Sequence, residues 1–498
     1  MNSRKVVIMF VNQLAVLFLN VLALKATLAA LSPADYGLYG YALSVTGLFM
    51  VFTELNLSNV YFKRVAEGEP VQLQYSTYIS IRLLFIGVAV LVFVLYVAIS
   101  GSSLIMISNR HLVVMGTTLV YYFFDAMMLA VMGAYQAQRE VRKTQTATAL
   151  MSLANLAFII VFVATTGNVL FLSLALVVKP LVGIACFAWL MKGELAIFRF
   201  TLDWKIIADY KRFVLPLLPM SILAAIYDRI DGTLVTNFLS FRDNGFLTAA
   251  SMFNTLLLIP STAILTLLYS SFSEEIRRKD YIRVQDISNR ATKYLSLLVS
   301  PIAMFFFFNA KELVVIAMSE EYLPAVPIIQ VFMFQVVLMS VSRTFGSILL
   351  ASEKLKLVST LGIATYVLGI VLDFILIPDR LFGVPMANLG ATGPAYKALI
   401  VYIVSIIATG LLLKRTMNIS IYWRFVFHII AAFLAGWMVN ALFPAEKGIF
   451  ELALFFVLSG GAYMLILIVL RELKRADADY IFSALAVWRG TPKEHKHG

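Results

Sequence analysis

The sequence predicts an all-α, polytopic membrane protein with about fourteen transmembrane helices. Of its 498 residues, 61% are hydrophobic and 14% are charged, whereas about a quarter of the residues of a soluble globular protein carry charge. The mean hydropathy is +0.88. Long apolar segments recur along the chain, and Lys and Arg gather in alternate connecting segments. The single Cys186 excludes a disulfide framework and a metal site built from Cys.

The apolar segments define the expected spans. A helix that crosses the hydrocarbon core needs about 20 apolar residues. We expect fourteen spans, at residues 6–31, 37–60, 78–100, 112–137, 144–166, 169–191, 213–239, 246–272, 293–313, 323–351, 357–378, 391–414, 421–443 and 449–470. The first segment is too long for a signal peptide and contains Lys25, so we expect it to remain as the first span.

Lys and Arg indicate the orientation, because loops on the cytoplasmic side of a membrane are enriched in them. With fourteen spans and the N-terminus inside, 29 of the 40 Lys and Arg residues lie in cytoplasmic segments, five lie outside and six lie within spans. Both termini are therefore expected to be cytoplasmic. The formal net charge of +12 then reflects topology and contact with the anionic headgroups of membrane lipids, and not binding of nucleic acid.

The connecting segments leave no room for a soluble domain, because none exceeds roughly twenty residues. The patterns G-x-x-x-x-G-K-[ST], H-E-x-x-H and G-x-S-x-G are absent from the sequence. These patterns would indicate nucleotide hydrolysis, a zinc protease or a serine hydrolase. We therefore expect a carrier that is not an enzyme and that uses neither a cofactor nor a metal centre.

A short repeat indicates two related halves. The segments "LSPADYGLYGYALSV" at 31–45 and "LSFRDNGFLTAASMF" at 239–253 share L-S-x-x-D-x-G at an offset of 208 residues. Each copy lies in an outside turn, where its Asp and Gly suit a helix N-cap and a tight turn. Both copies have the same orientation, so we expect parallel halves around an axis along the membrane normal, with a cavity between them.

The expected divisions of the chain follow from this repeat. They are an N-terminal lobe of six helices at 1–192, a cytoplasmic linker at 193–212, a C-terminal lobe of six helices at 213–415, two further helices at 416–470 and a cytoplasmic tail at 471–498.

These residues resemble a known family. The turn L-S-x-x-D-x-G and the segment "YDRIDGTLVTNFLSFRDNGF" that begins at Tyr227 are similar to the polysaccharide-transporter (Wzx-type) branch of the multidrug/oligosaccharidyl-lipid/polysaccharide exporter superfamily. The resemblance covers the first twelve spans. It implies a flippase of the cytoplasmic (inner) cell membrane, with a lipid-linked oligosaccharide on polyprenyl pyrophosphate as its substrate and other polysaccharide-assembly proteins as partners. Flipping to the outer leaflet would serve the biosynthesis of cell-surface polysaccharide.

Three charged residues near the middle of the seventh span need an explanation, because charge within a bilayer normally faces a cavity or a partner. Asp228 and Asp231 are three residues apart and share a helix face, whereas Arg229 points about 100° away from Asp228. Two carboxylates on one face should not both stay ionised alone. Either one is protonated, or a cation lies between them, or basic side chains from other helices intervene. A purely structural set of ion pairs is the alternative.

Other charged residues lie at a similar depth in the outer half of the bilayer. Counted from the expected helix ends, Asp231, Asp373 and Lys397 are about 7 to 12 Å deep. The resemblance implies a sodium site between the seventh, eleventh and twelfth spans, to which Asp231, Asp373 and Thr392 would correspond. Lys397 departs from this pattern, since its ammonium can replace the ion by pairing with Asp373. A proton is therefore the alternative coupling ion, and an ion pair without transport function is a further alternative.

Four cations within spans are candidates for binding an anionic headgroup. Lys179, Arg229 and Arg343 fall near the bilayer midplane and Lys25 approaches it, and a guanidinium donates paired hydrogen bonds to phosphate oxygens. We expect Asp125 to be their counter-charge when the cavity is empty. Two further charged residues, Arg82 and Glu54, are expected near the cytoplasmic interface, where their side chains can reach water.

The sequence thus favours a flippase that works by alternating access. A multidrug exporter of the same superfamily is the first alternative, although cationic drugs favour a cavity dominated by carboxylates and the spans hold six basic and five acidic residues. A membrane polysaccharide polymerase or glycosyltransferase is the second, although such enzymes usually carry a sizeable soluble loop.

Overall fold

A computed structural model provides the structure of the protein. It describes residues 3–53, 55, 57–66, 69–100, 108–137, 141–191, 200–215, 217–352, 354–443 and 447–472. Glu54, residues 193–199 of the expected linker and nearly all of the expected tail lie outside the described residues.

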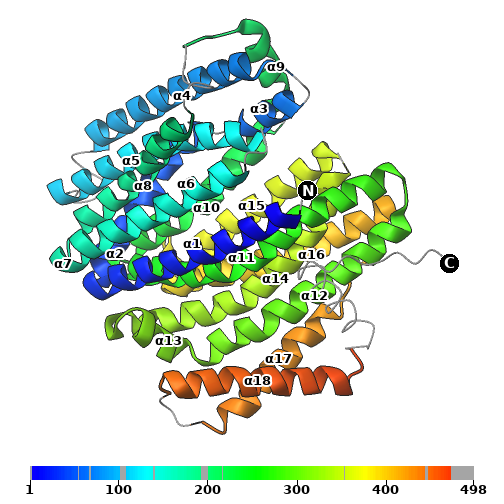
Figure 1. The fold of residues 1–498 in the computed structure, drawn as a ribbon. Coiled ribbons are helices and arrows are strands. Elements are labelled where there is room, and N and C mark those ends of the chain that lie inside the picture. The colour runs from blue at the N-terminus through cyan, green and yellow to red at the C-terminus, as the bar shows by residue number, and fades with distance from the viewer. Residues whose placement is uncertain are drawn as a thin grey trace.

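The structure is built almost entirely from helices (Figure 1). Its first half contains α1 (Ser3–Ala30), α2 (Pro33–Met50), η1 (Val51–Thr53), α3 (Leu57–Ala66), α4 (Val71–Ser100), α5 (Asn109–Ala137), α6 (Val141–Phe158), η2 (Ile159–Val163), α7 (Ala164–Thr166), α8 (Val169–Met191) and α9 (Trp204–Val214). Its second half contains α10 (Leu218–Phe238), α11 (Phe241–Arg277), α12 (Tyr281–Phe308), α13 (Ala310–Ala317), η3 (Glu320–Ala325), α14 (Val326–Ala351), α15 (Leu355–Leu376), β1 (Arg380–Leu381), β2 (Val384–Pro385), η4 (Gly390–Thr392), α16 (Gly393–Met417), α17 (Phe425–Asn440) and α18 (Ile449–Val469).

Each expected span overlaps one or more helices of this structure, so the predicted all-α membrane fold is confirmed. Among the described residues, nine helices are long and apolar enough to cross a membrane, and two shorter apolar helices cover Ala15–Ala30 and Phe425–Asn440. Neither group includes α2, α10 or α11. These three helices pack on one another at the contact between the two halves, where side chains face protein instead of lipid. The number of spans and the sidedness of the termini stay predictions.

Two segments, the expected second span and the expected linker, differ from what the sequence predicts. The expected continuous span at 37–60 is wrong, because α2 ends at Met50, a 3₁₀ turn follows, and Leu55 adopts a left-handed φ of 33°. The expected linker contains a helix, α9, whose first turn is capped by the carboxylate of Asp203. This helix is fixed to the end of α3 by an ion pair between Asp209 and Arg64.

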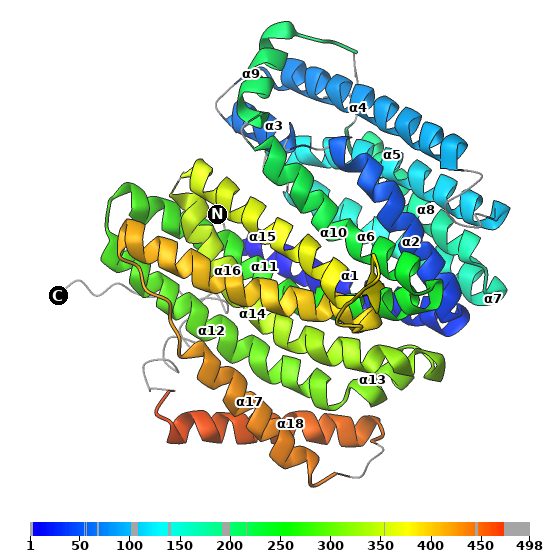
Figure 2. The same ribbon diagram turned by 180° about the vertical axis from the view of Figure 1, so that it is seen from behind.

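The helices form two lobes that lie side by side, with α17 and α18 at the far edge of the second lobe (Figures 1 and 2). The first lobe contains α1 to α8 and the second contains α10 to α16. Between them, α2 packs against α10 and α11, while α17 packs against α12 and α18. The first residues of α1 and the last residues of α18 lie at the same end of the bundle as α9 (Figures 1 and 2).

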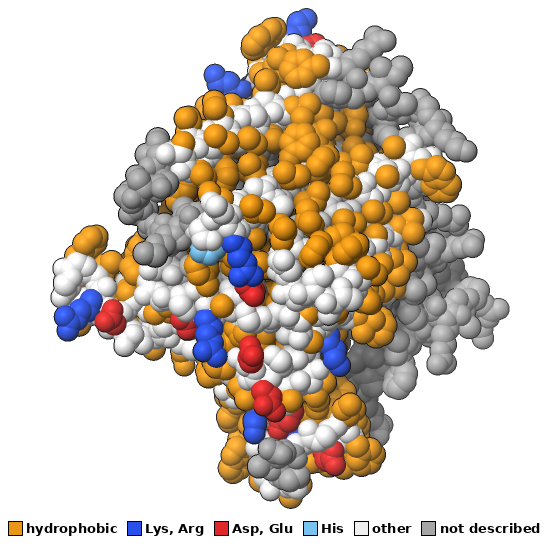
Figure 3. All heavy atoms as spheres, turned by 90° about the vertical axis from the view of Figure 1, so that its left-hand side faces the viewer, with side chains coloured by type: hydrophobic (Ala, Val, Ile, Leu, Met, Phe, Trp, Pro, Cys, Tyr) orange, Lys and Arg blue, Asp and Glu red, His pale blue; other side chains and the backbone are white. Residues whose placement is uncertain are grey.

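Much of the surface is hydrophobic, as a lipid-facing surface requires. Figure 3 shows a face on which hydrophobic side chains predominate and charged side chains are scattered. Several large apolar side chains on α4, α8 and α18 are more than half exposed, including Val88 at 58%, Trp189 at 68% and Val469 at 80%. Lipid tails cover such surfaces at no hydrophobic cost, so this is a multi-pass protein of the cell membrane.

The two copies of L-S-x-x-D-x-G start α2 and α11 in the same way. Ser32 and Ser240 are the N-cap residues, and each hydroxyl accepts a hydrogen bond from the backbone N–H of Asp35 or Asp243 at 3.2 Å. The expectation that the Asp is the N-cap is therefore wrong: the Ser has that role, and the Asp lies in the first helical turn, where a negative charge is favourable.

The Gly of each copy serves a close helix crossing, and not the tight turn that the sequence suggested. A Cβ on Gly37 would lie 1.6 Å from the carbonyl oxygen of Phe241, and a Cβ on Gly245 would lie 1.8 Å from that of Pro33. Pro33 and Phe241 are themselves separated by the repeat offset of 208 residues. The contact is therefore reciprocal, and it relates the two lobes by a pseudo-two-fold axis between α2 and α11.

Side-chain hydrogen bonds hold this crossing at the predicted outer ends of the helices. The amide of Asn244 donates to the carbonyl oxygen of Gly37 at 2.9 Å. The hydroxyl of Tyr322 donates to the carbonyl oxygen of Leu31 at 3.1 Å. The two lobes are thus in backbone contact at this end of the bundle.

Replacing either crossing glycine should destabilise the contact between the lobes. We expect Gly37→Ala and Gly245→Ala each to lower the free energy of unfolding by about 1 to 3 kcal/mol, because a Cβ collides with backbone that cannot easily move. The check is the apparent melting temperature of the purified protein in detergent.

Gly87→Ala is the matched control, because no atom lies within 4 Å of a Cβ at this helical glycine. It should leave the melting temperature unchanged or raise it slightly, since Ala favours a helix over Gly by about 0.5 to 1 kcal/mol. Equal effects of all three substitutions would contradict a specific role for the crossing.

Candidate functional site

Lys397 joins three helices inside the second lobe. Its ammonium makes an ion pair with Asp373 of α15 at 3.0 Å and a second ion pair with Asp231 of α10. The Lys397 and Asp373 side chains are 1% and 0% exposed, whereas that of Asp231 is 29% exposed. The ring of Tyr227 lies 4.3 Å from the ammonium and completes its surroundings. We call Asp231, Asp373, Lys397 and Tyr227 the lysine cluster.

Local sequence explains how the lysine cluster forms. Asp231 follows Tyr227 by four residues, so both side chains lie on one face of α10. Pro394 lies in the first turn of α16, and Lys397 follows one turn inside this helix, where it meets Asp231 of α10. On α15, a Cβ at Gly369 would lie 2.2 Å from the Tyr227 ring, so the glycine provides the space that Tyr227 occupies. One carboxylate oxygen of Asp373, Oδ1, is buried and has no hydrogen-bond partner in the described part of the chain.

Thr392 lies just before α16 and points elsewhere. Its hydroxyl donates to the carbonyl oxygen of Leu389 at 2.6 Å, within its own 3₁₀ turn. Among the residues that the structure describes, no group of three or more His, Cys, Asp or Glu side chains is arranged to hold a metal ion.

Asp228 lies between Tyr227 and Asp231 of the lysine cluster in the sequence of α10 and is an exposed residue. It is within electrostatic range of Arg229 and Arg343, as well as Asp231 and Lys397. The phenol groups of Tyr366 and Tyr402 are also in its electrostatic range. Asp228 is therefore an accessible carboxylate with charged and phenolic neighbours from α10, α14, α15 and α16.

Arg229 points from α10 toward the other lobe. Its guanidinium carbon lies 5.5 Å from the centre of the Tyr122 ring on α5. Its Cδ and Nε lie against α2, since a Cβ on Gly47 would be 3.1 Å from each of them. The half-buried guanidinium thus crosses the contact between the lobes, and Gly47 makes the space for it.

Asp125 provides the negative charge on the first-lobe side. This half-buried carboxylate is within electrostatic range of Lys179, Arg82 and Arg229. Lys179 is half-buried on α8, one residue before the helix-interior Pro180. The structure thus brings two of the expected headgroup-binding cations, Lys179 and Arg229, near the same carboxylate.

The expectation for Arg82 is wrong. We predicted that its side chain reaches interfacial water, but it is 2% exposed and donates to the hydroxyl of Tyr78 at 2.7 Å. The error arises because α4 begins at Val71 and not at residue 78, which places Arg82 well inside the helix.

Lys25 is exposed on α1, and no carboxylate among the described residues pairs with it. Its expected contact with the headgroup stays a prediction. Around Asp125, the structure adds Arg82 to the expected cations Lys179 and Arg229.

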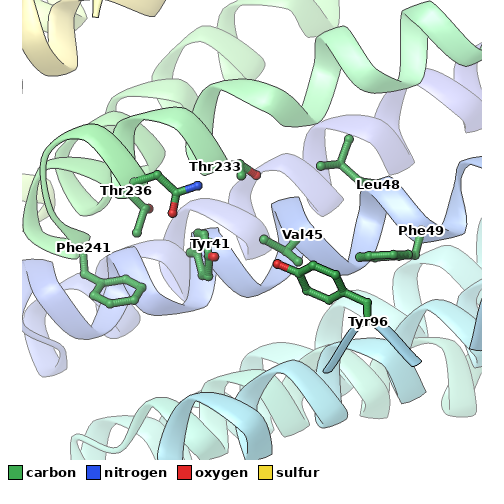
Figure 4. A pocket seen from close by; sticks show the side chains of 9 residues that line it. Tyr41, Val45, Leu48, Phe49, Tyr96, Thr233, Thr236 and Phe241 are labelled. Atoms are coloured by element: carbon green, nitrogen blue, oxygen red, sulfur yellow. The ribbon is translucent and has the colours of Figure 1, made fainter. Parts of the chain in front are cut away.

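A pocket of about 500 Å³ opens along the contact between the lobes. Figure 4 shows Thr233 and Thr236 of α10 on one side and residues of α2 on the other, with Tyr96 of α4 beside them. The lining residues are Tyr41, Val45, Leu48, Phe49, Tyr96, Thr233, Thr236, Asn237 and Phe241. Four aromatic rings and three small polar side chains thus face one space that both lobes build.

The comparisons with known proteins agree with this architecture. A sequence profile for the family described as "Polysaccharide biosynthesis protein" matches residues 28–327. No curated protein matches the chain at a significant level of sequence similarity.

Several solved structures share the fold. The lipid II flippase MurJ in an inward closed conformation is 16% identical, with a TM-score of 0.70 over 94% of this chain and 99% of that chain. An inward-facing multidrug resistance transporter of the MATE family is 13% identical, with a TM-score of 0.64 over 82% and 99%. A superfamily transporter from Pyrococcus furiosus with a binding pocket of reverse polarity is 14% identical, with a TM-score of 0.57 over 84% and 96%.

Removing the cation of the lysine cluster should strongly destabilise the protein. We expect Lys397→Met to lower the free energy of unfolding by about 3 to 5 kcal/mol, because two carboxylates then lack their partner inside the lobe. Adding Asp373→Asn to Lys397→Met should restore part of the loss by removing one of these charges. Thermal unfolding in detergent measures both effects.

Lys356→Met is the control for this experiment, because Lys356 is exposed on α15 and lies outside the lysine cluster. It should change the melting temperature little. A double variant no more stable than Lys397→Met alone would contradict the electrostatic explanation.

Proposed function

Because the chain belongs to the family of polysaccharide biosynthesis proteins, we propose that it moves an oligosaccharide linked to polyprenyl pyrophosphate from the cytoplasmic to the outer leaflet. Family and fold together confirm the resemblance to the polysaccharide-transporter branch of the multidrug/oligosaccharidyl-lipid/polysaccharide exporter superfamily. The substrate, the site and the coupling ion belong to our proposal.

The observation that carries the proposal is the position of Arg229. Its guanidinium extends from one lobe to the other, beside Tyr122 and Gly47. A guanidinium in a water-poor setting binds phosphate oxygens strongly, through two parallel hydrogen bonds. A pyrophosphate bound there would contact both lobes, so its passage would depend on how they are arranged. Lys179 and Arg343, from opposite lobes, would add charge on either side.

Asp125 and Asp228 would balance the charge of these cations when no substrate is bound. Each carboxylate is within electrostatic range of Arg229. An anionic headgroup would replace these partners at Arg229. The released carboxylates would then pair with their other cations, Lys179 and Arg82 for Asp125 and Arg343 and Lys397 for Asp228, or take up a proton.

The pocket between the lobes suits a sugar. Aromatic rings such as Tyr41 and Tyr96 offer flat apolar faces, while Thr233, Thr236 and Asn237 offer hydrogen bonds to hydroxyl groups. The pocket lies one to two turns from Arg229 along α10, so a sugar next to the bound pyrophosphate would reach it.

For coupling, the lysine cluster favours a proton over sodium. Two carboxylates and one ammonium leave one negative charge when all are ionised, and such a charge is costly inside a lobe. A proton on Asp231 or Asp373 would remove it. The ammonium of Lys397 already stands between the two carboxylates, where a sodium ion would have to bind, and the Thr392 hydroxyl is engaged by Leu389.

The first test replaces Arg229. The variant is expressed in a strain that lacks the chromosomal gene. We expect Arg229→Ala to slow flipping about tenfold or more, because the substrate loses at least one charge-assisted hydrogen bond. Arg229→Lys should not restore the full rate, because an ammonium cannot bind phosphate in the paired way. The measurement is the amount of sugar-loaded polyprenyl carrier left on the cytoplasmic side.

Arg380→Ala is the control, since this exposed arginine lies in the β1–β2 hairpin and lines neither the pocket between the lobes nor the lysine cluster. Normal flipping by Arg229→Ala at normal expression would remove this residue from the substrate path. If deletion of the gene causes no accumulation of loaded carrier but sensitises the cells to cationic drugs, the multidrug exporter is the correct alternative.

The second test concerns the coupling ion. In proteoliposomes, we expect an imposed pH gradient to change the flipping rate and a sodium gradient to have no effect. Asp373→Asn should abolish the response to the pH gradient, whereas Asp379→Asn, in the exposed loop after α15, should retain it. A sodium-dependent rate in the unmodified protein would contradict the proton proposal.

A further inference from the structure

A second pocket, far from the lysine cluster, lies at the end of the second lobe where α16 ends and α17 begins. Its volume is about 620 Å³. The lining residues are Gln285, Asn289, Lys414, Asn418, Ser420, Ile421, Tyr422, Trp423 and Arg424. By the distribution of Lys and Arg, this is the predicted cytoplasmic end of the helices.

The walls of this pocket are held in place by specific contacts. The side chain of Gln285 on α12 accepts from the backbone N–H of Ser420 at 2.6 Å and donates to its carbonyl oxygen at 3.0 Å. Asn418 ends α16 in the left-handed conformation, with φ of 57°. Ile421 packs over Gly410, where a Cβ would lie 2.0 Å from its Cδ1. The segment 418–424 is therefore fixed on the lobe.

The pocket is positively charged. Among the described residues, its lining includes Lys414 and Arg424 and no Asp or Glu. Arg424 is oriented from behind by Glu472, whose carboxylate accepts one of its hydrogen bonds at 3.0 Å and is itself 8% exposed. The side chain of Arg424 remains 61% exposed, so donors are left for a ligand. Lys414 is exposed and forms no ion pair with any described carboxylate.

The apolar surface beside the pocket indicates that an anionic ligand would be a lipid and not a free phosphate ion. Trp423 is 54% exposed at its rim, and Phe427, Ile430, Leu434 and Trp437 continue from it as exposed residues. The spacing of three and four residues places the last four of them in one row along α17, and Trp423 lies just before this helix begins. A ligand with a phosphate in the pocket and acyl chains along this row would match both surfaces, whereas free phosphate would use only the first.

We propose that this pocket binds the phosphate headgroup of an anionic phospholipid from the predicted cytoplasmic leaflet. Lys414 and Arg424 contact the phosphate, the amides of Asn289 and Asn418 contact the glycerol part of the headgroup, and the acyl chains lie on Trp423 and on the Phe427–Trp437 row of α17. The lipid would fasten α17 to the ends of α12 and α16. This proposal is independent of the transported substrate.

The test uses the full-length protein, purified in detergent and depleted of lipid. Binding of dioleoyl phosphatidylglycerol, dioleoyl phosphatidylcholine and inorganic phosphate is measured by native mass spectrometry and by the shift in melting temperature. We expect phosphatidylglycerol alone to bind and to stabilise the protein. Lys414→Gln should weaken binding about fivefold, the loss expected for one basic side chain at an anionic lipid surface.

Arg415→Gln is the matched control, because it removes the same charge from the next residue, which is also exposed and does not line the pocket. It should bind phosphatidylglycerol normally, and Lys414→Arg should retain binding. Equal losses in Lys414→Gln and Arg415→Gln would show unspecific attraction and overturn the proposal. Displacement of the lipid by millimolar inorganic phosphate, or equal binding of phosphatidylcholine, would also overturn it.

Discussion

The ion pairs between Lys397 and the two carboxylates of Asp231 and Asp373 fix the internal geometry of the second lobe. A charge in the hydrocarbon region must be paired or must face a cavity. By pairing with residues of α10 and α15, Lys397 of α16 ties three helices together at one depth. The rest of α10 is oriented as a result. With Asp231 held toward α16, Arg229 must point toward the first lobe, where it meets Tyr122.

The contact between the lobes complements this rigid centre. Gly37 and Gly245 bring α2 and α11 into backbone contact at one end, and Gly47 accommodates Arg229 further along α2. A transporter that alternates between two states needs lobes that move as rigid units about the contact between them. The lysine cluster stabilises the second lobe. The groups that we propose bind the substrate lie at the contact between the lobes. Coupling would then require only that protonation of Asp231 or Asp373 alters how α10 packs on α2.

The sequence predicted the helices well, because apolar length is a local property of the chain. It also placed Asp231, Asp373 and Lys397 at a common depth, which the structure shows as one cluster. It failed where the answer depends on a distant partner. The role of Gly37 depends on Phe241, and the position of Gly47 beside Arg229 has no local signal. Arg82 was misplaced because its helix begins seven residues before the expected apolar segment.

The most direct measurement of the central claim is a structure of the protein with a polyprenyl-pyrophosphate sugar in a lipid nanodisc. The account predicts that the two phosphates lie between the lobes, within hydrogen-bond distance of the Arg229 guanidinium, and that Lys397 stays paired with an aspartate of its cluster. Phosphates bound at Lys397 instead, or bound away from the contact between the lobes and without contact to Arg229, would contradict it.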